Sequence, residues 1–328
     1  MGNTPFLRAV ARVGDKEMSL HRSRLNHLND YIKYAHDFKV VLKLYAKEKF
    51  KPFKLNVERV FRIPVKSERL KDINAALYKV IALMMMAYEY PLQSWSASDL
   101  AQDAMMEISS TNRLGLKAFL QEICKNNFLK NLQLDVLEIY PRMLDAELVM
   151  RPALFLDFDT EYAENRVAMR VSAQSFEEFK DLYKDISEII SRETVLVAGM
   201  NNLLKRGDHN AFAEKLATNG RNLAPENLNA FADVDFGRKL GFIDDSWHDI
   251  LDDAANNKLR NAIAHYKAEY DDLTQVITYF PMREGMEQHA SERIYFLEFT
   301  RLLLISYREM HRLGHLIKGL FYYLFIVM

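Results

Sequence analysis

Three side chains that can act on a phosphate lie within the six residues from Arg260 to His265. Arg260 is a permanent cation that can donate two parallel hydrogen bonds to phosphate oxygens. His265 can take or give a proton near neutral pH, and Asn261 can orient the imidazole or the substrate. In a helix, Asn261 and His265 share one face and Arg260 lies about 100° from Asn261. The segment therefore predicts a cleft flanked by phosphate-binding and proton-transfer groups.

Cleavage of RNA without a metal needs this combination of groups. A base must remove the 2′-hydroxyl proton, an acid must protonate the leaving 5′-oxygen, and positive charge must lie at the phosphorus. One copy of His265 serves one of the proton transfers, and a symmetric dimer supplies two copies. A second interpretation is that Arg260, Asn261 and His265 cap a helix, because cations near a helix C-terminus are favoured by its dipole.

The segment from Leu259 to Tyr266 resembles the signature of the HEPN superfamily, in which Arg precedes a polar residue and, after about three more residues, His. The resemblance covers about residues 175–328. It implies a helical bundle that dimerises into a composite ribonuclease site, with Arg260 and His265 as the catalytic pair and Asn261 in support. It also implies RNA as partner and a role in bacterial anti-phage defence or a toxin system. Because some HEPN-like domains bind nucleotides or proteins without cleaving RNA, a non-catalytic binding module is the alternative.

Further candidates for RNA contacts flank the motif and recur in the first half of the chain. Lys258 and Tyr266 are the neighbours of the motif. The earlier group comprises Lys47, Lys49 and Lys51, interleaved with Tyr45, Phe50 and Phe53. Lysines can follow phosphates while aromatic rings stack on bases. The other interpretation of this group is a pair of solvated helix ends.

No metal site or cofactor is predicted. His311 and His315 have the helical spacing of a metal-binding pair, but Arg312 stands where a zinc hydrolase has Glu. Asp157 and Asp159 lie in an acidic stretch that lacks the later Gly and Glu of a calcium loop. We therefore interpret that stretch as a solvated linker.

The composition is that of a mainly α-helical globular protein. Of the 328 residues, 49% are hydrophobic and 27% charged, with only 11 Gly and 8 Pro. The net charge of −1 means that any nucleic-acid binding must be local. The single Cys124 excludes a disulfide framework and favours a cytoplasmic location. The apolar run at residues 320–328 is too short to span a membrane, so no membrane partner is expected.

The apolar spacing predicts helices joined by short connectors, in two domains. We expect residues 1–150 to form a helical domain of unknown role, 151–174 a linker, and 175–328 the HEPN-like domain. Helices are predicted for residues 18–49, 67–90, 96–109, 113–125, 128–147, 175–204, 210–218, 244–265 and 291–324. Residues 53–65 partly alternate and predict a short extended connector or an edge strand. Residues 268–271 and 274–280 predict a hairpin or flap after the motif helix.

A third interpretation is that the ribonuclease activity is latent until a regulatory partner or a phage-derived trigger loosens the first half of the chain.

Overall fold

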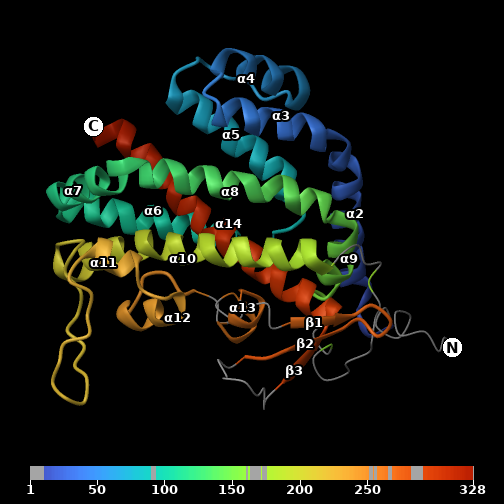
Figure 1. Cartoon of the computed structure of the whole chain (residues 1–328). Coiled ribbons are helices and arrows are strands. Elements are labelled where there is room, and N and C mark those ends of the chain that lie inside the picture. The colour runs from blue at the N-terminus through green and yellow to red at the C-terminus, as the bar shows by residue number, and fades with distance from the viewer. Residues whose placement is uncertain are drawn as a thin grey trace. The chain divides into compact units, whose positions relative to one another are not determined.

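The computed structural model describes residues 11–89, 94–159, 162, 171, 176–250, 254, 257–264, 268–281 and 291–327. The fold is mainly α-helical with one small antiparallel sheet, which confirms the predicted fold class (Figure 1). The α-helices are α2 (Asp15–Tyr31), α3 (Ala35–Ala46), α4 (Phe50–Asn56), α5 (Leu70–Met85), α6 (Ser94–Thr111), α7 (Arg113–Cys124), α8 (Phe128–Asp145), α9 (Glu147–Phe155), α10 (Phe176–Arg206), α11 (Leu228–Ala232), α12 (Phe236–Lys239), α13 (Asn257–Ala264) and α14 (Phe296–Val327). The strands are β1 (Ala268–Asp271), β2 (Val276–Tyr279) and β3 (Glu292–Tyr295).

The chain forms two compact units, each built from three segments. Unit 1 comprises Met1–Tyr90, Glu138–Lys184 and Lys258–Arg308, and unit 2 comprises Pro91–Leu137, Asp185–Asn257 and Glu309–Met328. Helices α8, α10 and α14 each contribute residues to both units. The linker predicted at residues 151–174 lies inside the second segment of unit 1, and no segment ends within it.

Aromatic rings from distant segments fill the core of unit 1. Tyr307 of α14 meets Tyr88 edge-on at 5.8 Å between ring centroids and Tyr140 at 6.3 Å, and all three rings are buried. Edge-to-face contacts of this kind add to the hydrophobic gain of burial. The start of α14 is thereby fixed in the core of the unit that also contains α13 and the sheet.

In unit 2, two glycines allow helices to approach closely. A Cβ atom at Gly199 of α10 would overlap the ring of Phe119 of α7. A Cβ atom at Gly319 of α14 would overlap the Met105 side chain of α6. Phe119 and Met105 are buried, so their side chains occupy space that only glycine leaves open.

The three-stranded sheet has the order β1–β2–β3, and both pairs are antiparallel. The first pair confirms the hairpin predicted after the motif helix. The third strand occupies residues at which the sequence predicts the start of the last helix, so that helix begins at Phe296 instead. The hairpin turn leaves Gln275 at a φ of 56°, and the Gln275 carbonyl accepts a hydrogen bond from the Phe296 amide.

The extended connector predicted at residues 53–65 is wrong. Residues 50–56 form α4, and Val57–Phe61 continue as a π-helical turn. Pro52 lies in the first turn of α4, where its missing N–H is not needed. Phe53, Val57 and Phe61 are buried at four-residue steps, which is a helical period. The apolar residues of this segment also alternate in part, which is why the sequence suggested an extended conformation.

Two further helix predictions are wrong, at residues 210–218 and 244–250. The helix predicted at residues 128–147 corresponds to α8, which contains Pro141, and α9 follows with Pro152 inside it. Residues 210–218 form an irregular loop in which Arg206 Nε donates to the Ala211 carbonyl. Residues 244–250 are also irregular, with Asp245 at a φ of 44°, so the motif helix begins only at Asn257.

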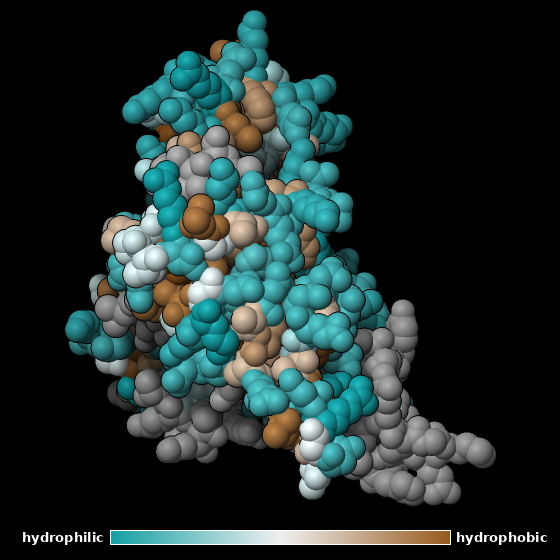
Figure 2. Space-filling view, turned by 90° about the vertical axis from the view of Figure 1, so that its left-hand side faces the viewer, coloured by the Kyte–Doolittle hydropathy of each residue, from teal (hydrophilic) through white to brown (hydrophobic). Residues whose placement is uncertain are grey.

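The surface and the helices of the chain bear on the prediction that no membrane partner is expected. Hydrophilic side chains cover most of the face shown in Figure 2, where hydrophobic ones form small separate areas. Within the described part of the chain, no helix combines the length and the apolar character that a membrane crossing requires.

Candidate functional site

The motif residue Arg260 lies on α13, a short amphipathic helix of unit 1. Leu259, Ala262 and Ile263 are buried and form one stripe of this helix. Arg260 is half-buried and lies outside the stripe. Positions at three- and four-residue steps share a face, so packing of Leu259, Ala262 and Ile263 fixes the rotation of the helix about its axis. The apolar residues of the motif thus anchor the helix that carries the cation.

The structure describes only some of the remaining motif residues. Lys258 and Asn261 are also positions of α13. His265 and Tyr266 lie outside the described residues. The grouping of Arg260, Asn261 and His265 around one cleft therefore stays a prediction.

The sheet that follows α13 is anchored by its inner face. Ile277 and Tyr279 of β2 are buried, and the Tyr279 hydroxyl donates to Glu292 Oε2 at 2.6 Å. Burial, followed by the hydrogen bond to Glu292, raises the pKa of Tyr279, so the phenol stays neutral. The Gln275 side chain donates to the Val171 carbonyl and accepts from the Val171 amide. These contacts hold the outer face of the sheet in a defined position within unit 1.

Two of the three aromatic residues of the early lysine group, Tyr45 and Phe53, are not available for the predicted base stacking. Lys47, Lys49 and Lys51 are exposed around the turn between α3 and α4. Tyr45 and Phe53 are buried, with their ring centroids 6.2 Å apart. These two rings belong to the core and cannot stack on bases. The lysines remain candidates for phosphate contacts alone.

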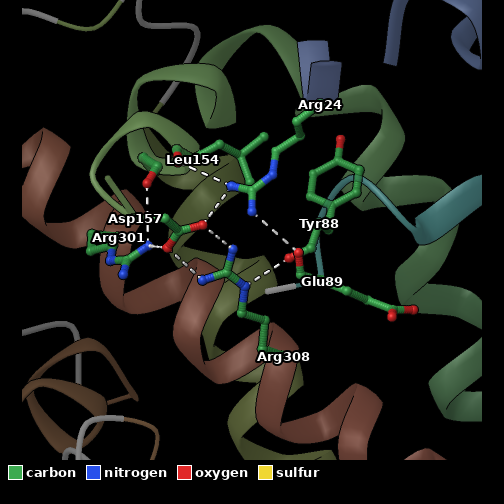
Figure 3. Close-up of polar contacts among 8 residues, drawn as sticks. Arg24, Tyr88, Glu89, Leu154, Asp157, Arg301 and Arg308 are labelled. Carbon is green, nitrogen blue, oxygen red and sulfur yellow. Dashed lines mark hydrogen bonds and ion pairs between the residues drawn. The ribbon is translucent and has the colours of Figure 1, made fainter. Parts of the chain in front are cut away.

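The interpretation of Asp157 and Asp159 as part of a solvated linker is wrong. The Asp157 side chain is 0% exposed, and three arginines converge on it (Figure 3). Arg24 Nη1 donates to Oδ2 at 2.6 Å, and Arg308 donates to both oxygens at 2.6 and 2.8 Å. Arg301 Nη1 also donates to Oδ1. Asp159 is buried and pairs with Arg12 at 2.6 Å.

Each of the three arginines also donates to a main-chain carbonyl at the end of a helix. Arg24 Nη1 donates to the Leu154 carbonyl and Arg301 Nη1 to the Ala153 carbonyl, both in the last turn of α9. Arg308 Nε donates to the Tyr88 carbonyl at 2.7 Å, just after α5. The C-terminal end of a helix carries about half a negative charge. The two α9 carbonyls therefore offset part of the excess positive charge, and the cluster ties α2, α9, α14 and the segment after α5 together within unit 1.

The Asp157 carboxylate is held in its ionised form. Burial acts to raise its pKa, but the hydrogen bonds and charges of Arg308, Arg301 and Arg24 outweigh burial and lower it. Four hydrogen bonds occupy the lone pairs that a base would need. The cluster is thus a structural tie, and Asp157 is unsuited to proton transfer.

A second buried polar cluster lies in unit 2. Glu309 of α14 is 0% exposed and accepts hydrogen bonds from His248 Nε2 at 2.9 Å and Arg312 Nη1 at 2.8 Å. Glu193 of α10 is also 0% exposed, and neither carboxyl oxygen has a hydrogen-bond partner among the described residues. Burial, and next the charge of Glu309, raise the pKa of Glu193 against the opposing effect of Arg192. The surroundings of Glu193 therefore favour the neutral form of its carboxyl group.

A sequence signal for Glu193 existed. Ile190, Glu193 and Val197 follow at three- and four-residue steps, so a carboxyl group occupies a position of the apolar stripe of α10. Asp157 offered no comparable local signal, because Arg24 and Arg308 lie 133 and 151 residues away.

The histidine pair of α14 makes a ring contact. The His311 and His315 ring centroids are 5.3 Å apart in an edge-on arrangement. Over the described ranges, no group of three or more His, Cys, Asp or Glu side chains is arranged to hold a metal ion.

Comparisons with known proteins return no relative. No family model, no curated protein and no solved structure matches the chain. The resemblance to the HEPN superfamily therefore depends on the motif and on its position in the sequence.

Proposed function

We propose that this chain is a metal-independent endoribonuclease of the HEPN type, whose active site is completed by a second copy of the chain. The observation that carries the proposal is the segment from Leu259 to Tyr266. In support, its apolar residues are buried on one side of α13, while Arg260 lies outside that stripe in a helix that is followed by a hairpin.

The proposed reaction balances without water or metal. His265 of one copy removes the proton of a ribose 2′-hydroxyl, and the 2′-oxygen forms a bond to phosphorus. The bond from phosphorus to the 5′-oxygen breaks, and that oxygen takes a proton from the second copy of His265. The products are a 2′,3′-cyclic phosphate and a 5′-hydroxyl. Arg260 donates to the non-bridging oxygens, whose negative charge increases in the transition state.

The first experiment measures cleavage by the full-length chain. Purified protein is incubated with single-stranded RNA in EDTA, and the fragments are tested for cyclic phosphate ends. We expect Arg260→Ala and His265→Ala to lower the rate about 100-fold or more. Arg221→Ala and His36→Ala, at exposed positions outside the motif, are the matched controls. Equal cleavage rates in the wild type and in both motif variants would contradict the assignment of Arg260 and His265 as catalytic residues.

The second experiment tests whether two copies share one site. Wild-type and His265→Ala chains are unfolded together, refolded at equal concentrations and assayed. If each site needs His265 from both copies, about a quarter of the dimers are active, whereas independent sites would retain about half. Size-exclusion chromatography with light scattering checks that the mixture has the same mass as the wild type.

The alternative function is a HEPN-like module that binds a nucleotide or a protein without cleaving RNA. It predicts no RNA cleavage by the wild type under any of these conditions. The role in anti-phage defence or a toxin system is proposed from the resemblance, and expression of wild type and His265→Ala in a bacterial host tests it through growth and phage plating.

A further inference from the structure

The outer face of the sheet in unit 1 forms a hollow. Its cavity has a volume of about 620 Å³. Ligand sites for small molecules commonly have volumes of about 300–1,000 Å³, so the hollow has room for a nucleotide. The residues that line it from this face alternate along the three strands. They are Glu269, Asp271, Val276, Thr278, Arg293 and Tyr295.

One row across the sheet combines three different polar groups. Glu269 pairs with Thr278, and Thr278 pairs with Arg293, so a carboxylate, a hydroxyl and a guanidinium lie side by side. Among the described residues, none of these three side chains forms a hydrogen bond or ion pair. The outer two are separated by two strand spacings, about 10 Å. Groups in this row are thus available to a ligand that offers donors at one end and negative charge at the other.

The neighbouring row supplies an apolar surface. Val276 pairs with Tyr295, whose side chain is 37% exposed. Tyr295 is two residues from Arg293 on the same face, so its ring lies within reach of a ligand that Arg293 contacts. An exposed aromatic ring beside polar groups is the usual means by which proteins hold an unpaired base.

We propose that this hollow binds a guanine nucleotide unit of single-stranded RNA. Glu269 accepts hydrogen bonds from the guanine Watson–Crick edge, Tyr295 stacks on the base, and Arg293 binds a phosphate. Thr278, between them, contacts the ribose. This assignment rests on the proposed ribonuclease function and names the base that its substrate presents.

Guanine fits Glu269 better than the other bases. Its Watson–Crick edge presents two adjacent N–H donors, which match the two oxygens of a carboxylate, whereas the edges of adenine, cytosine and uracil each present an acceptor beside the donor. A paired duplex cannot enter, because its Watson–Crick edges are occupied. Asp271 does not compete for the base, because its carboxylate already accepts three hydrogen bonds in the hairpin turn. The donors are the main-chain amides of Leu273 and Thr274 and the Thr274 hydroxyl.

The place of the sheet in the chain connects the hollow to the motif. β1 begins at Ala268, shortly after α13 ends at Ala264, and both belong to unit 1. A base held by the sheet is therefore expected in a nucleotide next to the cleaved bond. Glu269, Tyr295 and Arg293 act as specificity residues in this proposal and take no part in proton transfer.

The experiment measures binding of GMP, AMP, CMP, UMP and guanosine to the full-length chain by isothermal titration calorimetry. GMP is expected to bind at least about tenfold more tightly than the other monophosphates. Glu269→Gln should remove this preference for GMP. Tyr295→Ser should lower the affinity for all four monophosphates about tenfold. Arg293→Gln should lower the affinity for GMP but not the affinity for guanosine. Asp272→Asn is the matched control, because this exposed carboxylate of the hairpin turn does not line the hollow.

The experiment distinguishes a wrong guanine site from a wrong ribonuclease function. Equal binding of all four monophosphates, or an unchanged GMP preference in Glu269→Gln, overturns the guanine site even if RNA is cleaved. Binding of a lysine-rich peptide that depends on Glu269 but not on Arg293 would show a protein-binding surface instead. The Arg260→Ala chain is expected to keep its affinity for GMP, so the site can be established even where cleavage is absent.

Discussion

Two buried carboxyl groups show how neighbours decide the charge of a side chain. Asp157 accepts four hydrogen bonds from three arginines, and its pKa is lowered. Neither carboxyl oxygen of Glu193 has a hydrogen-bond partner among the described residues. Burial and the charge of Glu309 both raise the pKa of Glu193. Burial acts on both groups in the same direction, so the difference comes from the donors. The two groups should therefore respond oppositely to substitution and to pH.

Replacing Asp157 should destabilise unit 1 strongly. Asp157→Asn removes the carboxylate that Arg24, Arg301 and Arg308 share and leaves these three guanidinium groups with an uncharged partner in its place. Breaking a buried ion pair costs about 3–5 kcal/mol in the free energy of unfolding. Asp145→Asn is the control, since this exposed partner of Lys39 should cost less than about 1 kcal/mol. Urea denaturation measures both, and similar values for the two variants would contradict the structural role of the cluster.

Replacing Glu193 should stabilise unit 2, increasingly so at high pH. The folded-state pKa of Glu193 lies above its unfolded value, so its contribution is fully present below the unfolded pKa and declines as the pH rises towards the folded pKa. The decline is at most about 1.4 kcal/mol per pH unit. Glu193→Gln cannot ionise and should therefore be more stable than wild type at pH 8, with a smaller difference at pH 4.5. Chemical denaturation at both values measures this, and a difference independent of pH would show that Glu193 is ionised in the folded chain.

At the scale of elements, local pattern predicted the long helices and failed where distant contacts decide. The periodicity of residues 175–204 predicted α10 almost to its ends, and the turn at Asp272 predicted the hairpin. Residues 244–250 were predicted as helix, but His248 is buried against Glu309, 61 residues away, and its amide donates to Ser246 Oγ. The position of Arg260 outside the buried stripe followed from spacing alone. The cluster around Asp157 could not be predicted from spacing, because the partners of Asp157 come from other segments of the chain.

The approach of α7 to α10 depends on Gly199. In Gly199→Ala the new Cβ atom would overlap the Phe119 ring, and overpacking of a buried site costs about 1–3 kcal/mol in the free energy of unfolding. Gly241→Ala is the control, because its Cβ atom would meet only the terminal amine of the Lys215 side chain, which is exposed, and no buried ring. Thermal unfolding should show a lower Tm for the first variant alone. Phe119→Leu combined with Gly199→Ala should recover part of the loss, and no recovery would place the strain elsewhere.

At the scale of the whole molecule, the two compact units are interleaved along the chain. Unit 1 takes its first two segments from before Lys184 and its third from Lys258–Arg308, which carries α13 and the sheet. Residues 1–174 therefore supply a large part of the unit that contains the candidate site. The sequence-based division into a regulatory half and a catalytic half implies instead that residues 175–328 form a body of their own.

Deletion of residues 1–174 distinguishes the two descriptions. The truncated chain lacks Asp157, so Arg301 and Arg308 lose the carboxylate that they bind, and Tyr307 loses its ring contacts with Tyr88 and Tyr140. We expect amides of α13, the sheet and the start of α14 to lose hydrogen-exchange protection, and the thermal transition of this region to disappear. Adding residues 1–174 as a separate chain during refolding should restore both, because it returns the missing partners. If residues 175–328 alone keep full protection and unfold cooperatively, the contacts of unit 1 are dispensable, and the predicted boundary at residues 151–174 describes the protein better than the interleaved units do.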